Sequence, residues 1–154
     1  MVKVAIVAGS RSDGELVNTA KETLDKFGIE SDIHYISAHR NPDKCRDFAL
    51  NAKKNGYSII IAIAGLAAHL PGVIASMTDL PVIGVPVEVG ALKGLDALLS
   101  IMQMPGSTPV GTMAIGKAGA KNAAIFSARI LALSDLKIAK KVAEYRKKLE
   151  EGKG

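Results

Sequence analysis

Aromatic residues are scarce in this 154-residue chain, which has no tryptophan, three tyrosines and three phenylalanines. Proteins that bind single-stranded nucleic acid stack successive bases on aromatic side chains, and those contacts carry much of the affinity. With so few rings, a stacking surface of this kind is not expected. The composition therefore argues against a nucleic-acid partner.

Cysteine is nearly absent as well, because Cys45 is the only one and no disulfide can form within the chain. Chains without disulfides are typical of a reducing cytoplasm, so we expect a cytoplasmic location. No motif surrounds Cys45, and we interpret it as a thiol on a helix face rather than a nucleophile. Long apolar runs are also missing: the apolar start over 2–8 is too short for a signal peptide, and nothing spans a bilayer. No membrane partner is expected.

Positive charge exceeds negative charge, giving a net charge of +5. Residues 137–153 hold seven Lys/Arg and three Asp/Glu, so most of the surplus lies in this C-terminal segment. We interpret the segment as a solvated helix face, with a membrane or nucleic-acid role as the alternative. For the nearly neutral remainder, a small anionic substrate would account for a few well-placed arginines.

The chain is organised around an unbroken apolar run over 59–64, followed by glycine and small residues. Such a run is typical of a parallel strand that is buried on both faces. Ligands of open α/β sheets bind just beyond the carboxyl ends of the strands. His69, which follows the run, therefore lies where a site is expected. The alternative is a histidine that only caps the start of a helix.

The first strand is expected over 2–8, and Ser10 and Asp13 lie in the turn after it. Ser12 or Asp13 is expected to cap the next helix, which ends near Gly28. Backbone N–H groups, hydroxyls and a helix N-terminus converge here, as at a phosphate or ribose site. The glycine patterns of a P-loop and of a dinucleotide fingerprint are both absent. Taken alone, the turn is interpreted as a helix cap, with a binding site as the alternative.

A second strand over 31–36 leads into Ser37-Ala38-His39-Arg40, and Pro42 opens the following helix. His39 and Arg40 therefore lie in a loop at the same edge of the sheet as the Ser10 turn and His69. A histidine exchanges protons near neutral pH, and an arginine stays charged, so the pair suits chemistry on an anion. His34 alternates with apolar residues and is interpreted as a flank histidine rather than a catalyst.

Beyond His69 the pattern alternates between strands and helices. Strands are expected over 81–87 and 110–115, and helices over 73–77, 95–102, 116–133 and 135–150. Alternation of this kind gives a parallel sheet with helices on both faces. The predicted fold class is therefore α/β: a three-layer α-β-α sandwich with a flavodoxin-like parallel sheet and an appended C-terminal helix.

The appended helix sets the predicted domain organisation. Residues 1–133 are expected to form the α/β catalytic domain and 134–154 a C-terminal helix. The apolar residues of this helix form one stripe among charges: Leu136, Ile138, Ala139, Val142, Tyr145 and Leu149. We expect the stripe to pack on a neighbouring subunit.

Four motifs together resemble the 5-(carboxyamino)imidazole ribonucleotide mutase family of purine biosynthesis, the catalytic-subunit type of phosphoribosylaminoimidazole carboxylase. They are Gly9–Asp13, Ser37–Asp43, Ala64–Gly72, and Gln103–Pro105 with Pro109–Gly116. The resemblance spans Val4 to about Leu133. Two places depart from it: Leu66, where the family most often has a second glycine, and the loop over 106–108.

The resemblance implies a reaction without cofactor or metal. A carboxylate moves from the exocyclic amine of the ribonucleotide to a ring carbon, by decarboxylation and recarboxylation of trapped CO2. His39 matches the family's general acid/base, and His69 is assigned to orientation or a second proton role. The substrate-binding positions implied are Ser10 and Arg40 for phosphate, Asp13 for ribose, Ser37 and Ala38 beside them, and Gly65, Ala67, Ala68 and Leu70 at the CO2 end.

A related branch of the family carboxylates aminoimidazole ribonucleotide directly with CO2. That branch carries Ser-Ala-His-Lys and Ala-Gly-Arg-Ser-Asn, where this chain has Ser37-Ala38-His39-Arg40 and Ala64-Gly65-Leu66-Ala67-Ala68-His69. The chain therefore sides with the mutases. The resemblance also implies a homo-octamer, and a transient contact with the upstream carboxyaminoimidazole synthetase is a further partner to consider.

Two other classes of function stay open at this point. A flavodoxin-like module that binds a nucleotide without catalysis is compatible with the fold, because a fold does not determine a function. A structural oligomerisation protein is also compatible, although it has no need of His39 and Arg40 at a strand end.

Overall fold

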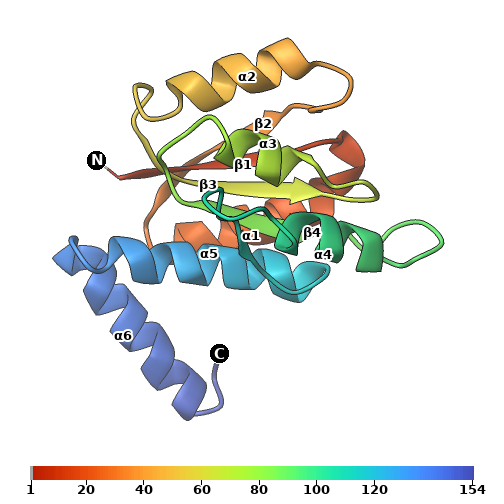
Figure 1. The fold of residues 1–154 in the computed structure, drawn as a ribbon. Helices are drawn as coiled ribbons and strands as arrows, with labels where there is room; N and C mark the ends of the chain where they lie inside the picture. Colours follow the sequence, from red (N-terminus) through yellow and green to blue (C-terminus); the bar gives the residue numbers. More distant parts are fainter. Residues whose placement is uncertain (1) are drawn as a thin grey trace.

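Parallel strands form the central sheet of the computed structural model, which describes residues 2–154 (Figure 1). The strands are β1 (Lys3–Ala8), β2 (Glu30–Tyr35), β3 (Tyr57–Ala64), β4 (Val82–Pro86) and β5 (Gly111–Thr112). Their order across the sheet is β2-β1-β3-β4-β5. From β1 the sheet is extended by β2 on one side and by β3, β4 and β5 on the other, so the strand order reverses between β1 and β3, which creates a crevice at the carboxyl ends of these two strands. The predicted α/β fold with a flavodoxin-like sheet is confirmed.

The two central strands are buried on both faces, which explains their unbroken apolar sequences. In β1, Val4 and Ile6 point into one hydrophobic cluster, whereas Ala5 and Val7 point into the other. The residues of β3 divide in the same way, because successive side chains of a strand face opposite sides. A strand with no face toward water needs no polar positions, so its sequence is a nearly continuous apolar run.

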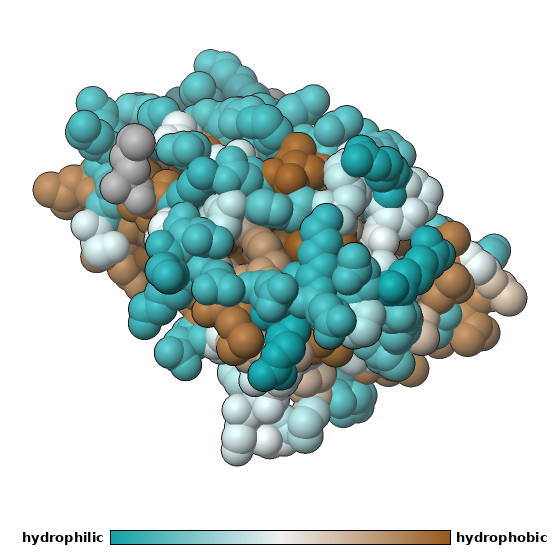
Figure 2. All heavy atoms as spheres, turned by 90° about the horizontal axis from the view of Figure 1, so that it is seen from above, coloured by the Kyte–Doolittle hydropathy of each residue, from teal (hydrophilic) through white to brown (hydrophobic). Residues whose placement is uncertain are grey.

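Helices cover both faces of the sheet in two layers (Figure 1). On one face lie α1 (Gly14–Lys26), α5 (Lys117–Leu131) and the start of α6 (Leu136–Glu150), and on the other lie α2 (Pro42–Asn51), α3 (Leu70–Ala75) and α4 (Leu95–Met102). Figure 2, which views the molecule from the α2 side, shows a mainly hydrophilic surface, with hydrophobic residues at both ends of the view and a few between them. Within residues 2–154, no helix combines the length and the apolar character that a membrane crossing requires.

Two element boundaries differ clearly from the sequence prediction. The last strand, expected over 110–115, is reduced to Gly111–Thr112. Its partner β4 ends at Pro86, which has no N–H to donate, so the regular hydrogen bonding between the two strands stops there. After Thr112, single backbone hydrogen bonds connect the chain to β4. The short helix expected over 73–77 begins earlier, at Leu70, because Pro71 suits the first turn of a helix.

The C-terminal helix α6 uses only part of its apolar stripe against its own domain. Ile138 is buried, and the Tyr145 ring meets Phe27 edge-on with ring centroids 5.3 Å apart. Leu136 and Leu149 remain 88% and 47% exposed, and the far end of the helix projects from the body (Figure 1). The expected contact with a neighbouring subunit therefore stays a prediction, and it now concerns the exposed ends of the stripe.

A polar network joins the first residues of β1 and β3 to the edge strand β2, on the side covered by α2. The Tyr57 hydroxyl donates to Asp32 Oδ2 at 2.7 Å and lies 2.8 Å from His34 Nε2. Lys3 forms an ion pair with the same Asp32 carboxylate. Hydrogen bonds from Lys3 and then Tyr57 lower the pKa of Asp32, and burial lowers the pKa of His34. His34 is therefore a structural histidine at the flank of the sheet, as the sequence pattern suggested.

We expect Tyr57→Phe to destabilise the protein by about 1–2 kcal/mol at neutral pH, because Asp32 and His34 each lose a hydrogen-bond partner. A depressed carboxyl pKa contributes stability above its unfolded value, and this contribution disappears as pH falls through the folded value. The difference in free energy of unfolding between variant and wild type should therefore become smaller below about pH 4, near the ordinary pKa of aspartate. Urea unfolding at both pH values measures it. Equal stabilities at neutral pH would show that the hydroxyl is not needed.

Candidate functional site

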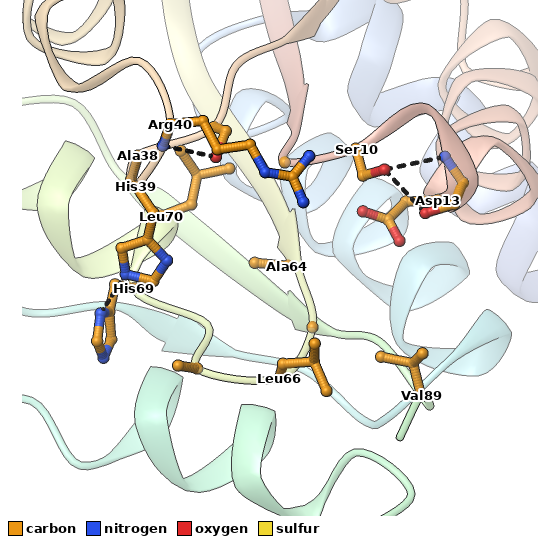
Figure 3. Close-up of a pocket in the computed structure, with 15 residues that line it drawn as sticks. Ser10, Asp13, Ala38, His39, Arg40, Ala64, Leu66, His69, Leu70 and Val89 are labelled. Atoms are coloured by element: carbon orange, nitrogen blue, oxygen red, sulfur yellow. Dashed lines mark hydrogen bonds between the residues drawn. The ribbon is translucent and has the colours of Figure 1, made fainter.

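A cavity of about 380 Å³ opens at the carboxyl ends of β1, β2 and β3 (Figure 3). Its walls come from the segments that follow these strands, which bring residues distant in sequence to one place. The lining includes these sequence-predicted site residues: Ser10, Asp13, Ser37, Ala38, His39, Arg40, Gly65, Ala67, His69 and Leu70. Ala68 is the exception, because its side chain is 1% exposed and packs in the core beneath the loop.

The turn after β1 presents the Ser10 hydroxyl in a defined orientation. Ser10 Oγ accepts hydrogen bonds from the Ser12 backbone N–H at 3.3 Å and from the Ser12 hydroxyl at 2.9 Å. A serine hydroxyl has two acceptor positions and one proton. Since both acceptor positions are used, the Ser10 O–H remains as a donor toward a ligand. Ser10 thus caps the short 3-10 turn Arg11–Asp13, and this capping is compatible with ligand binding. Asp13 occupies the N-cap position of α1, one of the two positions expected, but its side chain makes no capping hydrogen bond.

Asp13 lies at the start of α1 with its carboxylate at the cavity (Figure 3). Its side chain makes no capping hydrogen bond, so the carboxylate oxygens face the cavity as acceptors. Partial burial raises the pKa of Asp13, and a hydrogen bond from the Ser10 backbone partly opposes this. Burial of this carboxylate costs free energy, and the carboxylate does not cap the helix. Binding a pair of ligand hydroxyls therefore explains its position better than a structural role does.

We expect Asp13→Asn to stabilise the free protein at neutral pH while weakening ligand binding. A carboxyl pKa raised by burial means that the charged form costs folding free energy above that pKa, and the cost disappears once the group is protonated. The gain in thermal midpoint should therefore be present at neutral pH and shrink toward about pH 4, where aspartate is normally protonated. Thermal unfolding at both pH values tests this. A variant less stable than wild type at neutral pH would assign Asp13 a structural role.

The loop after β2 is held by hydrogen bonds between its backbone N–H groups and its own side chains. Ser37 Oγ accepts the Arg40 N–H at 3.1 Å, and Asn41 Oδ1 accepts the Lys44 N–H at 3.1 Å to cap α2. With these turns fixed, His39 and Arg40 project outward at the cavity. In Figure 3 the Arg40 guanidinium extends toward Ser10 and Asp13. A cation, a hydroxyl donor and a carboxylate acceptor therefore share one end of the cavity.

The two histidines touch at the other end. His39 Nε2 and His69 Nδ1 are 2.7 Å apart, and the rings meet at 86° with centroids 4.7 Å apart. Such a contact requires one nitrogen to carry a proton and the other to offer a lone pair. His69 occupies the N-cap position of α3, but its side chain makes no capping bond. The alternative interpretation of His69 as a helix cap is therefore wrong for the side chain, which contacts His39 instead.

Val89 is a lining residue that the sequence analysis did not identify. It follows β4, which neighbours β3 in the sheet, so the loop after β4 reaches the same edge. The sequence feature that could have identified Val89 as a lining residue is its position shortly after the predicted strand over 81–87. Leu66, noted earlier only as a departure from the family, lines the cavity beside it (Figure 3).

Cys45 lies away from the cavity. Cys45 is buried in α2 outside the cavity lining, and burial raises the pKa of its thiol, in agreement with the interpretation of a structural residue. Among residues 2–154, no group of three or more His, Cys, Asp or Glu side chains is placed to hold a metal ion.

Comparison with known proteins gives consistent results across the whole chain. A family model described as AIR carboxylase matches residues 3–152. An N5-carboxyaminoimidazole ribonucleotide mutase of Brucella melitensis is 55% identical over 146 residues, which cover 95% of this chain and 90% of that protein. A protein of the same description from Thermotoga maritima is 51% identical over 150 residues, covering 97% and 86%.

Solved structures agree with the sequence comparison. A crystal structure of Treponema denticola PurE superposes with a TM-score of 0.89 and 27% sequence identity. The superposition covers 99% of this chain and 94% of the other, so it includes the sheet, both helical layers and the C-terminal helix.

Proposed function

Because the chain belongs to the AIR carboxylase family, we propose that it converts 5-(carboxyamino)imidazole ribonucleotide to 4-carboxy-5-aminoimidazole ribonucleotide in purine biosynthesis. The observation that carries the proposal is identity of 55% and 51%, over nearly the whole chain, to proteins described as N5-carboxyaminoimidazole ribonucleotide mutases. The arrangement of the cavity supports the same reaction.

The reaction exchanges a carboxyl group and a proton between two atoms of the substrate. The bond between the exocyclic nitrogen and the carboxyl carbon breaks, the nitrogen keeps the electron pair and takes up a proton, and CO2 is released. The ring carbon then forms a bond to CO2 and loses its own proton. The sequence is redox-neutral and balanced in protons. The protein must therefore bind the phosphate of the substrate, provide an apolar site for CO2 and supply a group that transfers one proton.

The described residues can meet each demand. We assign the proton transfer to His39, with His69 holding the ring through the 2.7 Å contact, because a histidine acts as general acid or base near neutral pH. Arg40 and the Ser10 hydroxyl suit the phosphate, and Asp13 suits the ribose hydroxyls. Gly65, Ala67 and Leu70 offer a small apolar surface for CO2, with the Ser37–Ala38 turn beside them. Ala68 supports this surface from beneath rather than lining it.

The deciding experiment is an assay with chelator present and without ATP, biotin or added metal. Formation of the carbon-carboxylated product from 5-(carboxyamino)imidazole ribonucleotide at low bicarbonate is the expected result. Product formed only from aminoimidazole ribonucleotide plus CO2 would instead identify a direct carboxylase. Tight nucleotide binding without turnover of either substrate would identify a binding module.

The proposal includes assembly and location. We propose a homo-octamer in the cytoplasm, with the 134–154 helix reaching a neighbouring subunit and residues 1–133 as the catalytic domain. The exposed side chains of Leu95, Leu99 and Met102 on α4 support assembly, because apolar groups gathered on a surface favour contact with another chain. Leu136 on α6 is a separate exposed apolar side chain on the opposite helical layer. Sedimentation equilibrium measures the assembly. A transient contact with the upstream synthetase would appear as direct transfer of substrate in a coupled assay.

A further inference from the structure

The contact between the two cavity histidines brings two potential metal ligands to one point. His39 Nε2 and His69 Nδ1 are 2.7 Å apart, and both residues are exposed at the cavity. They belong to different segments, one after β2 and one after β3. A neutral imidazole nitrogen is the commonest protein ligand of transition metals. Two such nitrogens that face each other provide half of a tetrahedral coordination shell.

The proton between the two nitrogens does not prevent both from binding a metal ion. A hydrogen bond between two neutral rings places one proton on one of the facing nitrogens. When that ring takes its other tautomer, the proton moves to the outer nitrogen, which is Nδ1 of His39 or Nε2 of His69. Within residues 2–154, the contact between the two rings is the one hydrogen bond that either side chain makes. The outer nitrogens can therefore carry the protons, and both facing nitrogens then offer lone pairs.

The rings need only a small separation to admit the metal. Bonds from zinc to histidine nitrogen are about 2.0–2.1 Å long, so two nitrogens on a tetrahedral zinc ion lie about 3.4 Å apart. The observed distance is 2.7 Å. Rotation of the rings can supply the difference, because no other side-chain hydrogen bond holds them and His69 does not cap α3. In Figure 3 the Arg40 guanidinium extends toward Ser10 and Asp13, so this cation does not fill the space between the rings.

The number of ligands indicates a reversible site. Structural zinc sites have four protein ligands and catalytic ones have three, with water or substrate in the remaining position. In the part of the chain that the structure describes, no third His, Cys, Asp or Glu side chain joins the two histidines. Water must therefore complete the coordination shell, and the metal can leave again. A metal on His39 Nε2 also uses the lone pair of the residue to which we assign proton transfer.

We propose that His39 and His69 form a reversible Zn²⁺ site, and that zinc bound there inhibits the enzyme by occupying the nitrogen of His39. Zinc is thus an inhibitor of this protein and has no part in the reaction. Binding of the metal depends only on the two rings, whereas the inhibition rests on the proposed function.

Calorimetric titration with Zn²⁺ tests the site without any measurement of activity. The protein carries no histidine tag, and chelator is removed before the titration. The variants are His39→Asn and His69→Asn, each of which removes one ligand. His34→Gln is the matched control, because His34 is the third and last histidine of the chain and lies outside the cavity lining, next to the Tyr57 hydroxyl. Thermal unfolding shows that each variant is folded.

We expect the wild type to bind one zinc ion per chain, and each cavity variant to bind zinc more than about tenfold more weakly. Loss of a residue that only supports a metal ligand already costs about 10- to 100-fold in affinity, and loss of a ligand costs more. His34→Gln should bind zinc as the wild type does. Absence of binding to the wild type would overturn the site, as would wild-type affinity in both cavity variants.

A second measurement tests the inhibition. In the mutase assay without chelator, Zn²⁺ should inhibit the wild type, and excess chelator should restore its activity. Full activity at zinc concentrations that saturate the site in the calorimeter would overturn the inhibitory role. If the wild type shows no turnover in any condition, the proposed function fails and the inhibitory role falls with it, whereas the calorimetric result still decides the site.

Discussion

Replacing His39 with asparagine is expected to lower kcat by about 10²- to 10⁴-fold, the range for loss of a positioned general acid or base. Asparagine can still form a hydrogen bond but cannot exchange a proton near neutral pH. His39 is exposed at the cavity mouth, and no buried packing depends on it, so folding should be unaffected. Steady-state assay of the purified variant, together with its thermal midpoint, measures both effects. Activity comparable to wild type would remove His39 from the proton transfer.

His69→Asn is the matched control for this experiment. It removes the partner that lies 2.7 Å from His39 but leaves the His39 ring in place. If His69 only orients the proton-transferring ring, its loss should reduce kcat less than the loss of His39. A larger reduction for His69→Asn than for His39→Asn would exchange the two roles.

Arg40→Ala is expected to weaken substrate binding by about 1.5–3 kcal/mol, because a charge-assisted bidentate contact to phosphate is lost. This corresponds to a rise in Kd of roughly 12- to 140-fold. The rest of the loop should persist, since Arg40 contributes its backbone N–H, rather than its side chain, to the bond with Ser37. Calorimetric titration with the product nucleotide measures the effect.

Two other variants separate the charge of Arg40 from its shape. Arg40→Lys keeps a cation but loses the planar fork, so an intermediate Kd is expected. Arg11→Ala removes a neighbouring arginine whose guanidinium lies 4.7 Å from the Tyr35 ring centroid and does not line the cavity. It should leave the Kd unchanged. Equal losses of binding affinity in Arg11→Ala and Arg40→Ala would indicate a general effect of positive charge instead of a direct contact of Arg40 with phosphate.

The fold followed from the sequence because its strongest signals are local. The apolar run of β3 has one stable place, the centre of a sheet covered on both faces, and helix-ending residues such as Gly28 mark the boundaries between elements. The edge at which Ser10, His39 and His69 gather follows from parallel topology alone. Each lies just beyond the carboxyl end of a strand, so no knowledge of side-chain packing was needed to bring them together.

The parts that sequence could not predict depend on contacts between elements. The short β5 results from a proline in the neighbouring strand, which its own sequence does not contain. The direct contact of the two histidines depends on ring orientations that tertiary packing sets. Ala68 looks like its neighbour Ala67, but the turn directs one into the core and leaves the other at the cavity.

The position of the cavity in the chain has a consequence for biosynthesis on the ribosome. All of its lining residues lie between Gly9 and Val89, whereas α5 is made later and covers β3 and β4 on the face that it shares with α1. A nascent chain that has extended only to the end of α4 therefore contains every chemical group of the site, yet it lacks the helix that completes, beside α1, the cover of this sheet face. A partly covered sheet face of this kind does not hold a fixed geometry, so the site should become ordered only after Leu131 has left the exit tunnel.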